Sequence, residues 1–202
     1  ILQNSVINTV LSALDAAVGG FDQRETLRYL RSALSPVDSN TCDQLENYAV
    51  IWGIRGSKWT QSWTGHPEGL GGQWDDDARK TLTWLNEVRY QVVAPLQRLQ
   101  SGFRDAKNLR GQVLALTAFL EDIRLQQQLT RMAQELDETG SPREAQILNQ
   151  LWEILLSALE QMFAVLGDTV WEPEHFSRLF RLLLSQYDVG TIPIAVDRVS
   201  AG

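Results

Sequence analysis

Residues 141–167 read SPREAQILNQLWEILLSALEQMFAVLG, and this stretch decides the class of fold. Ser141, Pro142 and Glu144 are a typical helix start, with a capping hydroxyl, a proline at the first helical position and an acid in the first turn. Apolar side chains then recur at the spacing of one helix face: Leu148, Leu151, Trp152, Leu155, Leu159, Met162 and Phe163. Gly167 ends the pattern, so the stretch predicts a long helix packed on a core.

The same periodicity recurs along most of the chain, with capping residues and glycines between the periodic segments. Helices are predicted over residues 2–18, 23–34, 39–51, 76–100, 109–139, 142–166 and 173–184, with a polar connection at 101–108. Asp38 or Ser39 is expected to cap the third helix, and Pro95 to kink or break the fourth. A β-like run occupies residues 192–202. The sequence therefore predicts a single all-α domain over residues 1–202, an irregular bundle of six to eight helices with a short C-terminal strand-like segment.

The composition excludes several classes of protein. Apolar residues make up 44% of the 202 residues and charged residues 21%, which is ordinary globular usage. No run approaches the roughly 20 apolar residues of a membrane span, so no membrane partner is expected. A single cysteine, Cys42, excludes an internal disulfide and a cysteine-rich metal site, and it fits a cytosolic protein. The net charge of −7 means that any contact with DNA has to come from a local basic patch.

Motifs of enzymatic sites are absent from the sequence. It has no GxxxxGK[ST] nucleotide-binding loop, no GxSxG nucleophile turn, and no HExxH or CxxC motif. Asp75, Asp76 and Asp77 are consecutive, and successive helix positions point about 100° apart, so charge placement at a helix N-terminus explains them better than a metal site. His175 fits a surface or packing position. No catalytic, cofactor-binding or metal-binding residue is therefore expected in this chain.

Residues 52–74, WGIRGSKWTQSWTGHPEGLGGQW, interrupt the helical pattern. They contain six glycines and four of the seven tryptophans, which predicts a long ordered loop. Cations and aromatic rings are interleaved in it, as in surfaces that hold nucleic acid by phosphate contact and base stacking. The candidate residues for contact with DNA or a partner are Trp52, Arg55, Lys58, Trp59, Trp63 and His66. The alternative is that the tryptophans pin the loop to the bundle while Arg55 and Lys58 bind backbone carbonyl groups.

Two phrases of the sequence resemble a known family. Residues 19–34, GGFDQRETLRYLRSAL, and 34–60, LSPVDSNTCDQLENYAVIWGIRGSKWT, are similar to the helicase-like half of AddB, called RexB in some bacteria. The matching residues of the second phrase are Asp43, Leu45, Glu46, Asn47, Tyr48, Gly53, Ile54, Gly56 and Trp59. The stretch from Ile192 to Gly202 resembles the family's IPPALDQVxVG run, whereas the middle helices agree with the family only in type.

The resemblance implies that the chain is a fragment of the AddB component of AddAB, a helicase–nuclease in which AddB is similar to superfamily 1 helicases. Residues 1–202 would be its 2B-like accessory domain, with cut points at both ends. The implied partners are the AddA subunit, double-stranded DNA ends and the remaining domains of the same chain. The implied cofactors of the parent complex are ATP, Mg and an iron–sulfur cluster, none of them held by this fragment. The implied role is non-catalytic, within a bacterial cytoplasmic complex that processes double-strand breaks for homologous recombination.

Two other functions stay open from the residues alone. One is a free-standing α-helical interaction module, whose amphipathic helices would grip a partner helix. A gene that ends near residue 202 would favour it, whereas a reading frame that continues into a nuclease domain would favour the AddB fragment. The other is a small hydrolase or metal enzyme, which is less supported because no pair of titratable groups has motif spacing.

Overall fold

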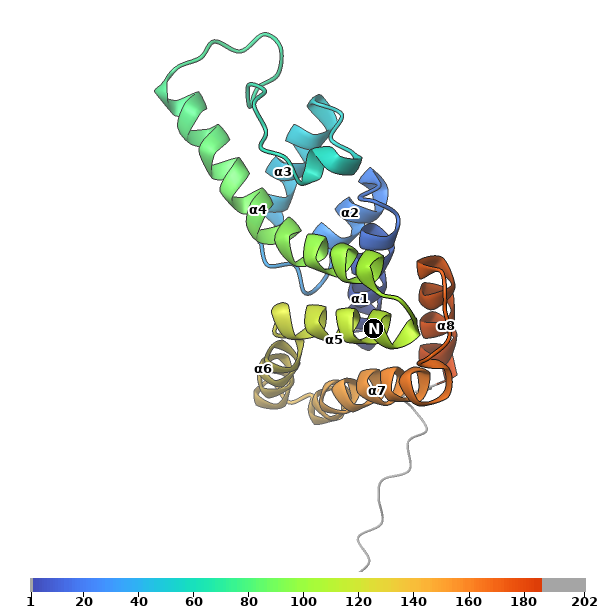
Figure 1. The fold of residues 1–202 in the computed structure, drawn as a ribbon. Coiled ribbons are helices and arrows are strands. Elements are labelled where there is room, and N and C mark those ends of the chain that lie inside the picture. Colours follow the sequence, from blue (N-terminus) through green and yellow to red (C-terminus); the bar gives the residue numbers. More distant parts are fainter. Residues whose placement is uncertain (1, 187–202) are drawn as a thin grey trace, which may run out of the picture.

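The computed structural model describes residues 2–186 of the chain, and every regular element in this range is a helix (Figure 1). The elements are α1 (Leu2–Val18), α2 (Gln23–Leu30), α3 (Ser39–Ile51), the 3-10 helix η1 (Gly56–Trp59), α4 (Asp76–Asp105), α5 (Leu109–Asp122), α6 (Leu125–Glu138), α7 (Pro142–Leu166) and α8 (Pro173–Gln186). The predicted all-α class is confirmed, with eight α-helices in the described range. The β-like run at 192–202 lies outside the described residues.

Helix α1 is one of the helices with the most neighbours in the bundle, because it contacts α2, α4, α7 and α8. Its buried face alternates branched side chains with alanines: Val6, Val10, Ala13, Leu14, Ala16 and Ala17. Small side chains bring helix axes closer together, so α1 can pack against several neighbours at once. Figure 1 shows α2, α3 and α4 toward one end of the molecule and α5, α6 and α7 toward the other, with α4 packed directly on α5.

Helix α4 is longer than predicted. Pro95 lies inside its 30 residues without ending it, so of the two predicted alternatives, a kink or a break, the break is wrong, and the predicted connection at 101–108 shrinks to three residues. A proline removes the hydrogen bond to the carbonyl four residues earlier, here that of Gln91. Gln91 is exposed, which allows water to replace the missing donor. Core packing on both sides of the proline, at Val92 and Leu99, holds the helix together across it.

The segment predicted as one helix over 109–139 is two helices, α5 and α6. Arg124 adopts a left-handed backbone with φ of 52°, and its N–H bonds the carbonyl of Glu121 at 2.8 Å. Such a backbone costs a residue with a side chain about 1 kcal/mol, and glycine or asparagine usually occupies it. Buried leucines continue on both sides, Leu120 before the turn and Leu125 after it. The turn aligns α6 with α7, against which it packs most extensively.

Most predicted helix ends are confirmed, with four corrections. Asp38 caps α3 through the N–H of Thr41, which decides between the two candidates for that cap. Ser141 precedes α7 as predicted, but its side chain makes no capping hydrogen bond. The other three corrections concern α2, α3 and α4. Helix α2 ends at Leu30, not at residue 34, and α4 extends beyond residue 100. Ile51 of α3 continues the apolar spacing of Leu45 and Tyr48, but it is exposed.

Candidate interaction surfaces

Residues 52–75 join α3 to α4 and fall into two halves with different surroundings. The inner half, residues 52–65, contains η1 and lies against α3 and α4. Trp59 is fully buried and Trp63 nearly so, and their rings tilt against each other with centroids 5.6 Å apart. Trp63 also stacks face to face on Tyr48 of α3, at 4.5 Å. The inner half is therefore an extension of the hydrophobic core.

Hydrogen bonds from Asn86 of α4 hold the inner half in one register. The side-chain oxygen of Asn86 accepts the N–H of Trp63 at 2.7 Å, and its amide nitrogen donates to the carbonyl of the same residue at 2.9 Å. The indole N–H of Trp63 donates to the carbonyl of Lys58 at 3.1 Å. Each of these bonds satisfies a polar group that would otherwise be buried without a hydrogen-bond partner. They explain why a loop with so many glycines is ordered.

Arg89 of α4 is the second support of the inner half. It is 6% exposed, donates to the carbonyl of Trp59 at 2.8 Å, and lies 5.8 Å from the ring centre of Trp63. No carboxylate of residues 2–186 pairs with it. Desolvation by burial lowers the pKa of its guanidinium group, because the charged form loses water without gaining an anion. Its role is therefore to hold the loop backbone.

The outer half, residues 66–75, is a turn held together by two hydrogen bonds of the His66 ring. The Nδ1 atom of His66 accepts the N–H of Glu68 at 3.1 Å, and Nε2 lies 3.1 Å from the carbonyl oxygen of Gln73. Both bonds form at once when Nε2 carries the proton. The ring lies against Gly72, where an added Cβ atom would come within 2.0 Å of Nδ1. The imidazole therefore fills the inside of the turn.

The six predicted contact residues separate into buried and exposed ones. Trp59, Trp63 and His66 are buried and Trp52 is half-buried, so their rings hold the loop in place and do not form an open stacking face. The indole N–H of Trp52 donates to the carbonyl of His66 at 3.0 Å. Lys58 is exposed and binds the carbonyl oxygens of Trp52 and Gly53.

Arg55 is exposed and pairs with no other group of the described residues. The structure thus brings five of the six residues into one packed assembly and leaves Arg55 and the Lys58 ammonium group at its surface.

Sequence reasoning missed the residues outside the loop that hold it. Asn86 and Arg89 interrupt an otherwise apolar face of α4, where Leu85 and Val92 are buried. A polar pair at helical spacing on a core-facing stripe is an available signal, because buried polar groups need partners. Periodicity marks Tyr48 only as a core residue. Its hydroxyl donates to the carbonyl of Gly65 at 3.1 Å, and burial raises the pKa of the phenol.

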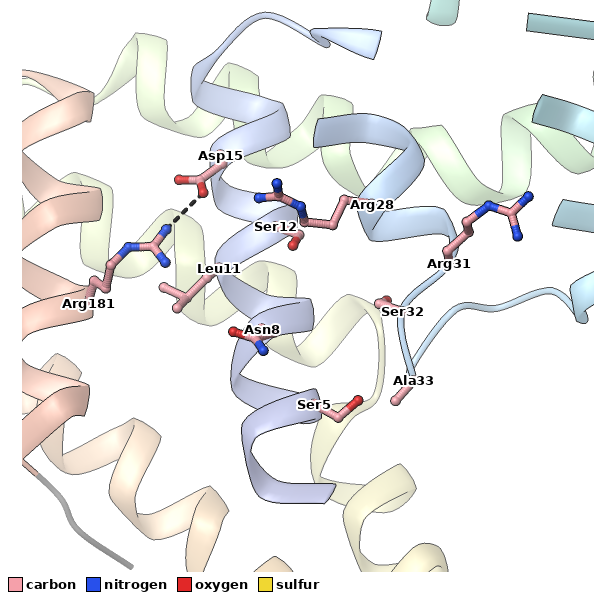
Figure 2. Close-up of a pocket in the computed structure, with 10 residues that line it drawn as sticks. All are labelled: Ser5, Asn8, Leu11, Ser12, Asp15, Arg28, Arg31, Ser32, Ala33 and Arg181. Carbon is pink, nitrogen blue, oxygen red and sulfur yellow. Dashed lines mark hydrogen bonds and ion pairs between the residues drawn. The ribbon is translucent and has the colours of Figure 1, made fainter. Parts of the chain in front are cut away.

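A polar pocket lies between α1, α2 and α8 (Figure 2). Its volume is about 370 Å³. Residues of α1 line the bottom of the pocket, and Arg28, Arg31 and Arg181 line its sides. The lining residues are Ser5, Asn8, Leu11, Ser12, Asp15, Arg28, Arg31, Ser32, Ala33 and Arg181. Ser12 is 4% exposed, and its hydroxyl bonds no other described residue, so it is open to the pocket.

The protein's own carboxylates balance the arginines of this pocket. Arg28 pairs with Glu25 at 2.8 Å, and Arg181 pairs with Asp15 at 2.8 Å. Arg31 pairs with Asp43 and Glu46 of α3, and hydrogen bonds to both carboxylates raise the pKa of its guanidinium group. The pocket has spare N–H donors for a small oxyanion, but it has no large excess of positive charge.

Residues 2–186 contain no group of three or more histidine, cysteine, aspartate or glutamate side chains that could hold a metal ion. Asp75 caps α4 through the N–H of Ala78, in agreement with helix charge placement. Cys42 is buried and donates to the carbonyl of Leu30 at 2.9 Å. One packed thiol does not fit an iron–sulfur cluster, which needs several thiolate ligands. None of the described helices combines the length and the apolar character of a membrane span.

Together these features describe an all-helical domain whose α3–α4 loop is packed on the bundle. Comparison with curated proteins then identifies its relatives. The chain is homologous to one segment of AddB, the B-type subunit of the ATP-dependent helicase/deoxyribonuclease, which the sequence phrases resemble. It is 27% identical to the AddB of Acetivibrio thermocellus over 100% of this chain, and 28% identical to those of Clostridium botulinum over 98% and Ruminiclostridium cellulolyticum over 100%. The chain spans 18% of the length of each. No family model matches it.

Proposed function

We propose that the chain is a non-catalytic helical domain, the 2B-like accessory region, of an AddB-type component of an ATP-dependent helicase–nuclease. The observation that carries this proposal is the match along the whole chain to AddB proteins. The parent protein would process double-strand DNA breaks for homologous recombination in the bacterial cytoplasm. It would do so with an AddA-type subunit and with ATP and Mg, and an iron–sulfur cluster would be held elsewhere in the parent chain.

The domain's task in this proposal is to brace the other parts of the complex. A brace needs a stiff core, and the stacked rings of Tyr48, Trp59 and Trp63 extend the core into the loop. Duplex DNA would pass along the face that carries Arg55 and Lys58, where both cations are exposed.

The parent activity can be tested with the full-length protein. Mixed with its companion subunit, it is expected to degrade linear duplex DNA only when ATP and Mg are supplied. Circular duplex DNA, which has no ends, serves as the control substrate and should stay intact. Absence of ATP-dependent degradation of the linear substrate would overturn the proposed function.

The DNA contact can be tested separately by salt titration. Arg55→Ala with Lys58→Ala in the full-length complex is expected to weaken duplex binding and to reduce the slope of log affinity against log salt by about two, one unit for each lost phosphate contact. Lys107→Ala with Arg131→Ala removes the same charge from exposed positions of other elements and is the matched control. If the Arg55→Ala/Lys58→Ala variant binds duplex DNA with the same affinity and the same salt slope as the control variant, this face is not the contact.

A further inference from the structure

The outer half of the loop carries an apolar surface that the core does not use. Leu70 is 94% exposed in the turn, and Trp74, four residues later in the chain, is 44% exposed. Val50 and Ile51, the last residues of α3, are exposed as well. Gly69 lies against the side chain of Ile51, which joins the two segments into one surface. We call the four apolar side chains of Val50, Ile51, Leu70 and Trp74 the loop tip.

The loop tip is held in one conformation before any partner arrives. Besides the two bonds of His66, the N–H of Gly69 donates to the carbonyl of His66 at 2.9 Å. The rings of His66 and Trp74 meet edge to face at 4.8 Å, and Arg79 lies 5.9 Å from the ring centre of Trp74. A turn whose backbone is already ordered binds with a smaller loss of conformational entropy than a mobile one. An exposed leucine on a fixed turn is therefore suited to enter a pocket.

The charges around the loop tip decide which kind of partner fits it. Between residues 64 and 80, four exposed acids face two cations: Glu68, Asp75, Asp76 and Asp77 against Arg79 and Lys80. Lys80 pairs with Asp77 at 3.3 Å, so these two charges offset each other and leave Glu68, Asp75 and Asp76 against Arg79. An acidic surround repels the phosphates of nucleic acid. It complements a protein pocket bordered by arginine and lysine.

We infer that the loop tip is a docking knob for a protein: Leu70, with Ile51 and Trp74, enters an apolar pocket rimmed by basic residues on the companion subunit of the complex. This inference rests on the proposed function. Figure 1 shows the loop and the first turns of α4 projecting at the end of the molecule opposite the start of α1 and the end of α8. The loop that carries the knob therefore lies far from both ends of the described residues.

The experiment uses the full-length AddB-type protein and its purified companion, and the dissociation constant of the pair is measured at several salt concentrations. Leu70→Asp places a charge in the pocket and is expected to raise the dissociation constant about 30-fold, the effect of one interface hot spot. Leu182→Asp on α8 is the matched control, because Leu182 is an exposed leucine at the other end of the fold. It should leave the affinity within about twofold of the wild type.

Asp76→Asn with Asp77→Asn tests the basic rim. The double variant should weaken assembly at low salt and lose most of its effect at high salt, because exposed charges are screened. A second readout is independent of any substitution: the amides of residues 67–73 should exchange more slowly with deuterium in the complex than in the free protein.

Two outcomes would overturn the inference. One is an unchanged dissociation constant for Leu70→Asp together with unchanged exchange in the turn. The other is normal assembly of Leu70→Asp with weakened duplex binding, which would make DNA the occupant. Both are distinct from failure of the proposed function, because the wild-type complex would still degrade linear DNA with ATP.

Discussion

The two halves of the loop between α3 and α4 are both rich in glycine and aromatic residues, yet they do opposite things. The inner half turns Trp59 and Trp63 into the core, whereas the outer half leaves Leu70 and Trp74 in solvent. The difference comes from what each half meets. Asn86 and Arg89 of α4 offer partners to the backbone of the inner half, while the outer half is bonded mainly to itself through His66.

This difference teaches that aromatic content alone does not indicate a stacking surface. A tryptophan becomes available to a ligand only when nearby elements leave its face uncovered. The inner rings are covered by α3 and α4, so the alternative that the tryptophans pin the loop is the one that agrees with their burial. The most exposed apolar group of the loop is a leucine, which no search for cations beside aromatic rings would select.

The largest expected effect tests whether the inner half is core. Trp59→Ala removes a fully buried ring and is expected to lower the free energy of unfolding by about 3–5 kcal/mol. Trp74→Ala in the outer half should cost less than about 1 kcal/mol, since surface changes have small effects. Urea denaturation followed by circular dichroism measures both. Similar losses in the two variants would remove the distinction between the halves.

Arg89 is expected to give the next largest effect. In Arg89→Leu the carbonyl of Trp59 loses its buried donor, which is expected to cost about 1–3 kcal/mol of stability. Arg79→Leu is the control in the outer half, because Arg79 is exposed, and it should change stability by less than about 0.5 kcal/mol. If the Arg89 variant is as stable as the wild type, Arg89 does not support the inner half.

A finer comparison lies within the inner half, between its two indole N–H groups. That of Trp63 donates to the carbonyl of Lys58, whereas that of Trp59 is buried without a partner among the described residues. Replacing each ring by phenylalanine removes similar volume, but only Trp63→Phe also breaks a hydrogen bond. Trp63→Phe is therefore expected to lower the free energy of unfolding by about 1 kcal/mol more than Trp59→Phe. Equal midpoints and slopes in urea would show that the Trp63 bond contributes nothing.

The smallest effect on global stability is expected in the outer half at Gly72. Gly72→Ala would drive a Cβ atom into the ring of His66 and open the turn. Global unfolding should change by less than about 1 kcal/mol, because the turn adds little to the core. The amides of residues 67–73 should nevertheless exchange faster with deuterium. Unchanged exchange there would mean that His66 does not hold the turn.

Sequence periodicity is sufficient for the fold class and for long elements such as α1 and α7, whose apolar stripes face one core. Periodicity does not predict where some helices end. Pro95 predicts a kink or a break, but tertiary packing on both sides outweighs one missing hydrogen bond, so the helix does not end there. The left-handed turn at Arg124 has neither glycine nor proline, so the apolar pattern runs through it unbroken.

The candidate site is predictable only in part. The tryptophans correctly indicate an ordered segment, but which of its side chains are exposed depends on Asn86 and Arg89, more than twenty residues away from the loop residues that they bind. Contacts at such separation leave no signal in the spacing of the loop itself. The AddB resemblance is detectable because its phrases, such as LENYAVIWGIRGSKW, lie in one continuous stretch.

The first and last described helices are clamped together, with Asp15 of α1 accepting from both Ser177 and Arg181 of α8. The start of α1 and the end of α8 consequently lie on one side of the molecule (Figure 1). Any polypeptide joined at these two ends would meet the bundle on this same side. A small rotation about that side would move the loop between α3 and α4 through a wide arc, because this loop lies at the opposite end of the molecule.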